Sequence, residues 1–142
     1  MKKNNKGFSL VELIVVILIM AIIAVALAPQ VMKWVDQSKV STDTNNRANL
    51  KSSLDAAVAD YMKDGKRISA TKSFKVDKDG LALATGTTLD SLFGTGFGSA
   101  VDEVTNGFWP EFKSTDAGYF EVTITDKGAV TVVVVSGVDG ED

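Results

Sequence analysis

Hydrophobic residues occupy the first part of the chain almost without interruption. From Phe8 to Ala28, twenty-one consecutive residues include one charged side chain, that of Glu12. An α-helix rises ~1.5 Å per residue, so this run is long enough to cross a hydrocarbon layer of ~30 Å. The pattern therefore predicts a membrane-spanning helix.

Beyond Pro29 the apolar residues recur at every third or fourth position, which is typical of a helix with one buried face. Proline removes one backbone donor, so we expect a kink between Leu27 and Gln30 rather than a helix end. Gly65 suits the left-handed position after the last turn. A single helix is predicted from Phe8 to Met62, and its stripe comprises Val31, Trp34, Val35, Leu50, Leu54, Ala57, Val58, Tyr61 and Met62.

The remaining chain, Gly65 to Asp142, is predicted to be β-structure with loops. Ser73 to Asp77 alternates polar and apolar residues as a half-buried strand does. Turn-forming residues from Asp77 to Gly80 then lead to a second short strand, Leu81 to Ala84.

A hairpin is predicted further along the chain. Tyr119 to Thr125 places Phe120, Val122 and Ile124 on one face of a strand. A three-residue loop, Asp126 to Gly128, connects it to Ala129–Val135. This last strand is apolar on both faces, so we expect it inside the sheet or against another subunit.

Three lysines, Lys2, Lys3 and Lys6, precede the apolar run with no acid among them. The positive-inside bias places the N-terminus in the cytoplasm and the chain after Ala28 across the membrane. Glu12 inside the hydrocarbon costs on the order of 2.5 to 3.5 kcal/mol. Its carboxylate either reaches the headgroups or meets a partner.

The residues Lys6-Gly7-Phe8-Ser9, together with Glu12 and the apolar run, closely resemble the class III leader of type IV prepilins. The resemblance implies that a membrane peptidase cuts between Gly7 and Phe8 and methylates Phe8. It also implies that Glu12 pairs with the Phe8 amine of a neighbouring subunit as a filament grows. It covers roughly the first thirty residues.

The resemblance implies the α+β pilin fold, in which a long N-terminal helix packs on a small antiparallel sheet. The expected parts are a leader (1–7), a transmembrane and filament-core half of the helix (8–29), an amphipathic half (30–64) and a C-terminal β-sheet region (65–142). Pro29 would take part in assembly with Phe8 and Glu12. Many relatives close a C-terminal loop with a disulfide, a pattern from which this cysteine-free chain departs.

The implied partners are further copies in a helical homopolymer, the prepilin peptidase and methyltransferase, and an inner-membrane assembly platform with its ATPase. The implied location is the cytoplasmic membrane before assembly, as a single-pass protein, and an extracellular pilus afterwards. No cofactor or metal is expected. Ordinary secretory cleavage after Ala26-Leu27-Ala28 is disfavoured, because the apolar run is longer than a usual signal core and Pro29 follows directly.

Composition narrows the function further. The chain contains no histidine or cysteine, which removes the commonest catalytic bases, the thiol nucleophile and most zinc sites. An enzyme is therefore not expected. Loss of residues 1–7 would lower Lys+Arg from 15 to 12 against 18 Asp+Glu, a net charge of about −6. A protein with this net negative charge repels phosphate groups, which argues against nucleic acid as the main partner of its surface.

Three short motifs have ordinary structural explanations. Gly94-Thr95-Gly96-Phe97-Gly98 lacks the spacing of a nucleotide fingerprint and is interpreted as a flexible connection. Asp77, Asp79 and Gly80 form only a fragment of a calcium loop, so a hairpin turn is preferred. The aromatic cluster Phe108–Phe112 is interpreted as a loop that packs its rings onto the sheet, with a binding patch as the alternative.

Charge is unevenly distributed. Val101 to Asp142 holds nine acids and two bases, whereas Lys63 to Lys78 holds two acids and six bases. The bases are Lys63, Lys66, Arg67, Lys72, Lys75 and Lys78. They are interpreted as solvated residues, as a subunit contact or as a DNA-binding patch.

The favoured hypothesis is a structural subunit of a type IV pilus. The alternatives are a major pseudopilin of a type II secretion or DNA-uptake machine, and a minor adhesin-like or DNA-binding tip pilin.

Overall fold

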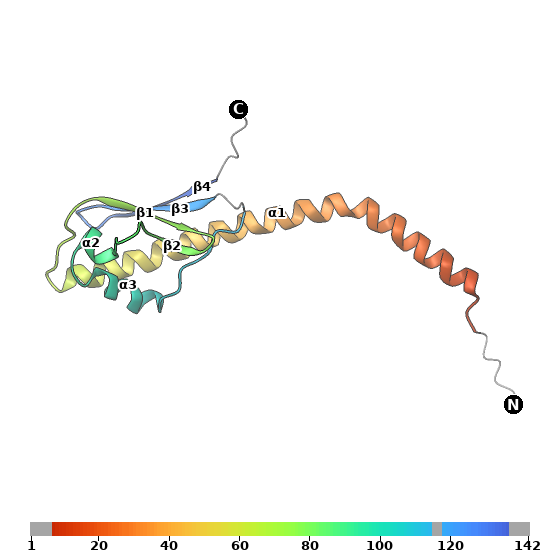
Figure 1. Cartoon of the computed structure of the whole chain (residues 1–142), viewed down its shortest axis with the longest axis horizontal. Helices are drawn as coiled ribbons and strands as arrows, with labels where there is room; N and C mark the ends of the chain where they lie inside the picture. The colour runs from red at the N-terminus through yellow and green to blue at the C-terminus, as the bar shows by residue number, and fades with distance from the viewer. Residues whose placement is uncertain (1–6, 115–117, 137–142) are drawn as a thin grey trace, which may run out of the picture. The chain divides into compact units, whose positions relative to one another are not determined.

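The computed structural model describes residues 7–114 and 118–136, drawn in colour in Figure 1. It divides into two compact units, Met1–Gln37 and Ser38–Asp142, and each is described by itself. Lys2, Lys3 and Lys6, with the rest of leader positions 1–6, lie outside the described residues. So does the chain end after Ser136.

One long helix, α1 (Leu10–Lys63), confirms the predicted N-terminal helix. It begins two residues after Phe8 and continues through Pro29. The kink at Pro29 stays a prediction. After the last turn, Gly65 adopts a φ of 74° and its N–H donates to the Met62 carbonyl at 3.0 Å, as expected for a left-handed terminus.

A four-stranded antiparallel sheet forms in the second unit, in the order β2-β1-β3-β4. Its strands are β1 (Lys72–Asp77), β2 (Gly80–Ala82), β3 (Tyr119–Ile124) and β4 (Val130–Val135). The register places Phe74 opposite Val122 and Val122 opposite Val132, so apolar residues share one face. The α+β architecture predicted from the sequence is confirmed.

Both predicted hairpins are present. β1 and β2 meet at the pair Asp77 and Gly80, and the Asp77 carboxylate accepts a bond from the Asp79 N–H at 2.8 Å. This side-chain turn accounts for the Asp77, Asp79 and Gly80 motif. Between β3 and β4, Gly128 adopts a φ of 83° and its N–H donates to the Thr125 carbonyl at 2.9 Å.

Of the two positions expected for the last strand, the one inside the sheet is wrong, because β4 is at an edge of the described sheet, and contact with another subunit stays a prediction. Its inward residues Val130 and Val132 are buried, whereas Val133 and Val134 are 48% and 37% exposed. The sequence shows that the strand is apolar, but strand order depends on pairing partners distant in the chain.

Two short helices occupy a region that was predicted to be loop. They are α2 (Leu89–Phe93) and α3 (Phe97–Thr105), joined at Gly94 to Gly96. The glycine-rich stretch is therefore a tight helix junction and not a flexible connection. Helices this short are marginal alone, and these two are stabilised by burying Phe93, Phe97 and Val101.

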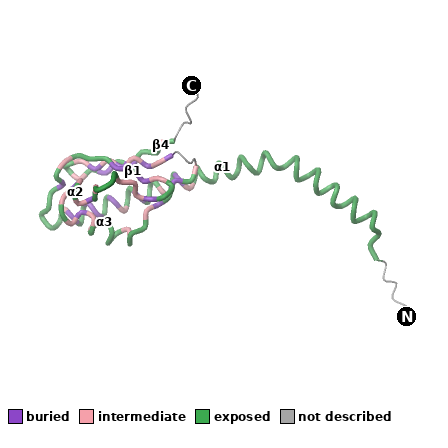
Figure 2. Tube along the Cα trace, viewed as in Figure 1, coloured by how far each residue is buried: buried purple, intermediate pink, exposed green. Residues whose placement is uncertain are grey.

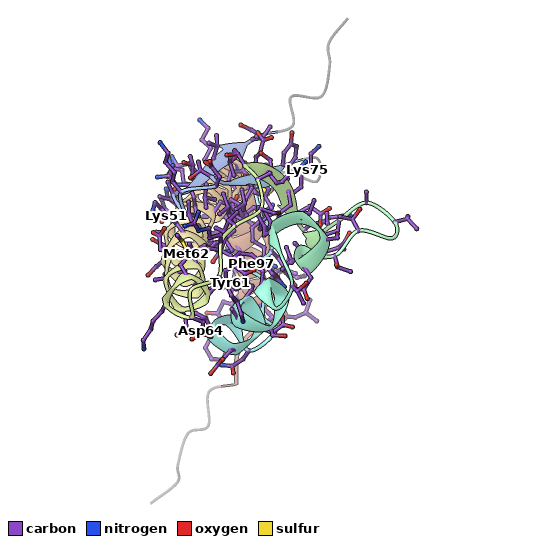
Figure 3. The ribbon with its side chains drawn as sticks, turned by 90° about the vertical axis from the view of Figure 1, so that its left-hand side faces the viewer. Lys51, Tyr61, Met62, Asp64, Lys75 and Phe97 are labelled. Atoms are coloured by element: carbon purple, nitrogen blue, oxygen red, sulfur yellow. The ribbon has the colours of Figure 1, made fainter. Side chains whose placement is uncertain are left out.

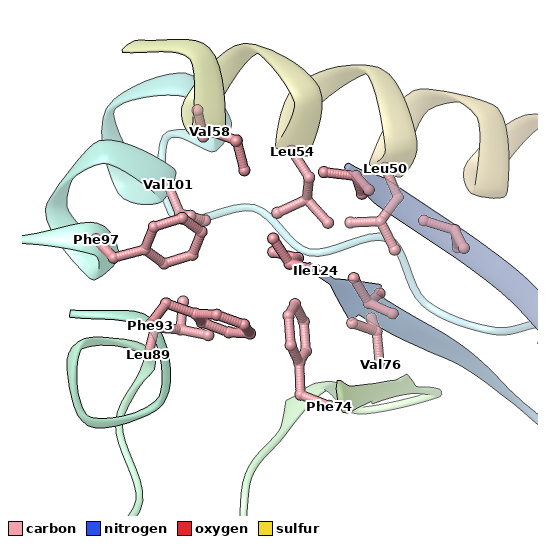
Figure 4. Close-up of a cluster of buried hydrophobic side chains, with 14 of the residues drawn as sticks. Leu50, Leu54, Val58, Phe74, Val76, Leu89, Phe93, Phe97, Val101 and Ile124 are labelled. Carbon is pink, nitrogen blue, oxygen red and sulfur yellow. The ribbon is translucent and has the colours of Figure 1, made fainter. Parts of the chain in front are cut away.

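The hydrophobic core lies between α1 and the sheet. In Figure 4, Leu50, Leu54 and Val58 project from α1 toward Ile124 and Val76 on the strands, while Phe93 and Phe97 close one end. The stripe from Leu50 to Tyr61 is buried as predicted. Val31, Trp34 and Val35, which were assigned to the same buried face, are exposed. Figure 2 shows this change in burial along α1.

A buried carboxylate fastens a loop to α1. Asp43 is 2% exposed, and its two oxygens accept bonds from the Lys113 N–H at 2.7 Å and the Ser114 N–H at 2.8 Å. One turn further along, the Asn46 amide donates to the Glu111 carbonyl at 3.0 Å. The segment from Glu111 to Ser114 is thereby held along the helix.

We expect Asp43→Ala to destabilise fragment 31–142, which lacks the apolar run and which we expect to be soluble and folded. Two part-buried N–H groups lose their acceptor, at about 1–3 kcal/mol each. Thermal unfolding followed by circular dichroism should show a lower Tm for Asp43→Ala. The exposed Asp60→Ala, on the same helix, should behave like wild type. Equal Tm values for the two variants would contradict the role assigned to Asp43.

Candidate processing and assembly site

The Gly7–Phe8 bond lies before the helix begins. Gly7, Phe8 and Ser9 have no regular secondary structure, and the Phe8 ring is 89% exposed. A Cβ added to Gly7 would meet no other atom within 4 Å. The packing of the chain itself therefore does not require glycine at this position, and the bond is accessible.

Glu12 stabilises the start of its own helix. The Ser9 N–H donates to Glu12 Oε2 at 2.9 Å, and the Ser9 carbonyl accepts the first helical bond, from Leu13 N–H at 3.2 Å. A serine followed three residues later by glutamate is the capping-box spacing, and a carboxylate there also suits the helix dipole. The sequence carried this signal, but the predicted roles for Glu12 did not include it. The pairing of Glu12 with a neighbouring Phe8 amine stays a prediction.

The apolar half of α1 is not covered by any other described part of the chain. Every residue from Gly7 to Ser41 is exposed. Pro29 lies within this exposed stretch of helix. Among the described residues, α1 is long and apolar enough near its N-terminus to cross a membrane. A surface this apolar requires lipid or other protein around it.

A comparison with known families finds a match over this region. Residues 2–28 match the family model described as a prokaryotic N-terminal methylation motif. The chain carries this methylation motif. Together with the long apolar helix, it is consistent with the type IV pilin family and supports a pilin-like or pseudopilin protein. The match ends before the second unit, and no curated protein and no solved structure matches the chain.

The basic residues from Lys63 to Lys78 do not all lie on one face of the second unit. Lys72 and Lys75 lie three positions apart in β1 and therefore point to opposite faces of the sheet. The Lys75 ammonium lies 4.2 Å from the Tyr119 ring centre, whereas that of Lys66 lies 5.3 Å from the Tyr61 ring centre. Figure 3 shows Lys75 near the strands and Tyr61 apart from it, beside Phe97 in the interior. Arg67 and Lys78 are exposed.

The aromatic cluster from Phe108 to Phe112 is divided by the fold. The Trp109 ring meets Phe74 edge-on at 5.9 Å, and the Phe112 ring meets Phe120 at 5.2 Å. Packing onto the sheet is thus confirmed for these two rings. Phe108 is 71% exposed, so the expectation is wrong for this ring.

A second carboxylate occupies the junction between α2 and α3. Asp90 accepts bonds from the Gly96 N–H at 3.0 Å and the Gly98 N–H at 2.6 Å, at the N-terminus of α3. These two backbone bonds, with a smaller contribution from the Lys66 charge, hold the pKa of Asp90 below its usual value although burial opposes them. The glycine-rich stretch thus has its N–H groups turned toward the chain's own anion, which explains it without a bound phosphate.

We expect Asp90→Asn to lower the Tm of fragment 31–142 at pH 7. Because folding lowers the pKa of Asp90, its stabilisation is fully present above the unfolded pKa of ~3.8 and is lost as the pH falls through the folded value. The difference in Tm between wild type and Asp90→Asn should therefore shrink below about pH 4. Asp102→Asn, at an exposed site on α3, is the control. A difference that stays constant from pH 7 to pH 3 would rule out this linkage.

Proposed function

We propose that the chain is the structural subunit of a type IV pilus filament. It is made as a precursor in the cytoplasmic membrane, cut between Gly7 and Phe8, and polymerised through α1. The observation that carries the proposal is the exposed apolar half of α1, which lies within the matched methylation motif. Families with this motif are structural rather than enzymatic.

Processing accounts for the residues around the cut. The Gly7–Phe8 bond is accessible and outside the helix, as a peptidase substrate must be. Since the fold leaves space for a side chain at Gly7, we attribute the glycine to the peptidase. Methylation of Phe8 by the same membrane enzyme follows from the motif. Lys2, Lys3 and Lys6 hold this bond at the cytoplasmic face.

Polymerisation accounts for the apolar helix. Lipid covers it before assembly, and α1 helices of further copies cover it afterwards, so each copy exchanges one apolar environment for another. Head-to-tail contacts of this kind do not close on themselves and generate an open helix. An inner-membrane assembly platform and its ATPase supply the work of extraction. The product is an extracellular filament.

A pseudopilin of a secretion or DNA-uptake machine would use the same leader and the same helix. The filament proposal predicts long surface filaments that disappear when the gene is deleted. Electron microscopy of cells with and without the gene tests this. A secretion or uptake defect without surface filaments would favour the pseudopilin. Binding of DNA receives no support from the scattered basic residues.

We expect the mature protein to begin at Phe8 and to carry an N-terminal methyl group. Intact and peptide mass spectrometry of protein from the native membrane measures both features. Gly7→Val should accumulate as the uncut precursor without unfolding, because the position is open. A mature chain that begins at Pro29 would instead identify an ordinary secreted protein.

The charge of Glu12 and its capping bond can be separated by two substitutions. Glutamine also serves at this position of a capping box, so Glu12→Gln keeps the bond to the Ser9 N–H and removes the charge. Glu12→Val removes both. If Glu12 pairs with a neighbouring amine, both variants should be inserted and cut normally and should fail to form filaments. Normal filaments from Glu12→Gln would show that capping alone matters.

A further inference from the structure

Three aromatic rings among the described residues are largely exposed, those of Phe8, Trp34 and Phe108. Phe8 heads the apolar run, but Trp34 follows it, in a segment that also contains Lys33, Asp36 and Lys39. Val31 shares the face of Trp34, being three residues earlier on the helix. An exposed tryptophan in such a mixed segment is a typical interface anchor.

The second unit contains a groove that fits one aromatic ring. Its volume is about 140 Å³, close to the ~150 Å³ cavity that binds benzene in another protein. The groove lies among α1, α3 and the loop after α3. It is lined by Asn46, Asn49, Leu50, Ser53, Val104, Thr105, Phe108 and Pro110.

The chemistry of the groove suits tryptophan in particular. A buried indole needs apolar contacts for its rings and an acceptor for its N–H. Leu50, Val104 and Phe108 offer the contacts. Asn46 offers an acceptor, because its amide nitrogen is already bonded to the Glu111 carbonyl and its side-chain oxygen can accept.

Charges of both signs adjoin the groove: the exposed Glu103 directly precedes Val104, and the exposed Arg47 directly follows Asn46. Lys33, which directly precedes Trp34, can pair with Glu103. Trp34 and Asn46 belong to the same continuous helix and are twelve residues apart, a rise of ~18 Å. A tryptophan side chain does not span that rise along a helix, so we consider Trp34 of a second copy as the occupant of the groove.

We propose that Trp34 of one copy docks into the groove of a second copy beside Phe108. The contact rests on the proposed function, because it requires that copies assemble. It adds a specific aromatic anchor, outside the apolar run, to the association of the helices. It also explains why Phe108 stays exposed while Trp109 and Phe112 pack into the fold.

Photo-crosslinking in the full-length chain tests the contact. A benzophenone amino acid replaces Trp34 in one sample, Met32 in a second and Ile17 in a third. Met32 is the matched control because it is as exposed as Trp34, at 65%, and faces another side of the helix. Cells express isotopically light and heavy chains together, so that mass spectrometry distinguishes crosslinks between copies from those within one chain.

The expected result is a crosslink between copies from position 34 to residues 46–53 or 104–110, with none there from position 32. Position 17 reports assembly through the apolar run. Crosslinks from position 17 without any from position 34 to the groove would overturn the docking contact and leave the filament proposal intact. No crosslink between copies from either position would overturn both. A crosslink from position 34 to its own chain would also overturn the contact.

Substitutions provide a second readout. Truncation of a central interface aromatic commonly weakens association about tenfold or more. Trp34→Ala and Phe108→Ala should therefore each reduce the yield of assembled protein strongly, and the double variant should be no worse than either. Both residues are exposed, so the monomer should keep its Tm. Met32→Ala should assemble normally, and an equal loss in Met32→Ala would contradict the proposal.

Discussion

The structure depends on one helix that is apolar on one face in its second half and on all faces in its first. Leu50, Leu54 and Val58 pack on the sheet, and this contact brings together strands that are about fifty residues apart in the chain. Within residues 7–114 and 118–136, nothing covers the first half in this way. The same element therefore organises a folded domain and leaves a long apolar surface that only lipid or other molecules can satisfy.

Carboxylates that accept backbone N–H bonds hold the irregular segments in a chain that has no cysteine. Asp43 fixes the loop before β3, Asp90 fixes the junction of α2 and α3, and Glu12 caps the start of α1. Each satisfies donors that would otherwise lack a protein partner. Hydrogen bonds to charged acceptors are stronger than those to neutral ones.

These arrangements connect the domain to the proposed assembly. The two hydrogen bonds that Asp43 accepts lie near the start of the second unit at Ser38. Asn46, three residues further along α1, both holds the loop and lines the groove. The side chain that holds the Glu111–Ser114 segment along α1 therefore also lines the groove proposed to bind a second copy. Trp34 lies just before this unit, in helix that the domain leaves exposed. The loop after α3 thus has two roles: it packs along α1 and it lines the groove proposed for Trp34.

The sequence by itself determined the features that depend on near neighbours. The apolar run, the end of α1 at Gly65, both hairpin turns and the inward face of β3 follow from spacing and from glycine's access to positive φ. The methylation motif is equally local. Only the tertiary structure decided the edge position of β4, the formation of α2 and α3, the division of the aromatic cluster and the partners of Asp43 and Asp90. Each of these depends on contacts between residues that are distant along the chain. The free energy of such contacts cannot be inferred from local sequence patterns.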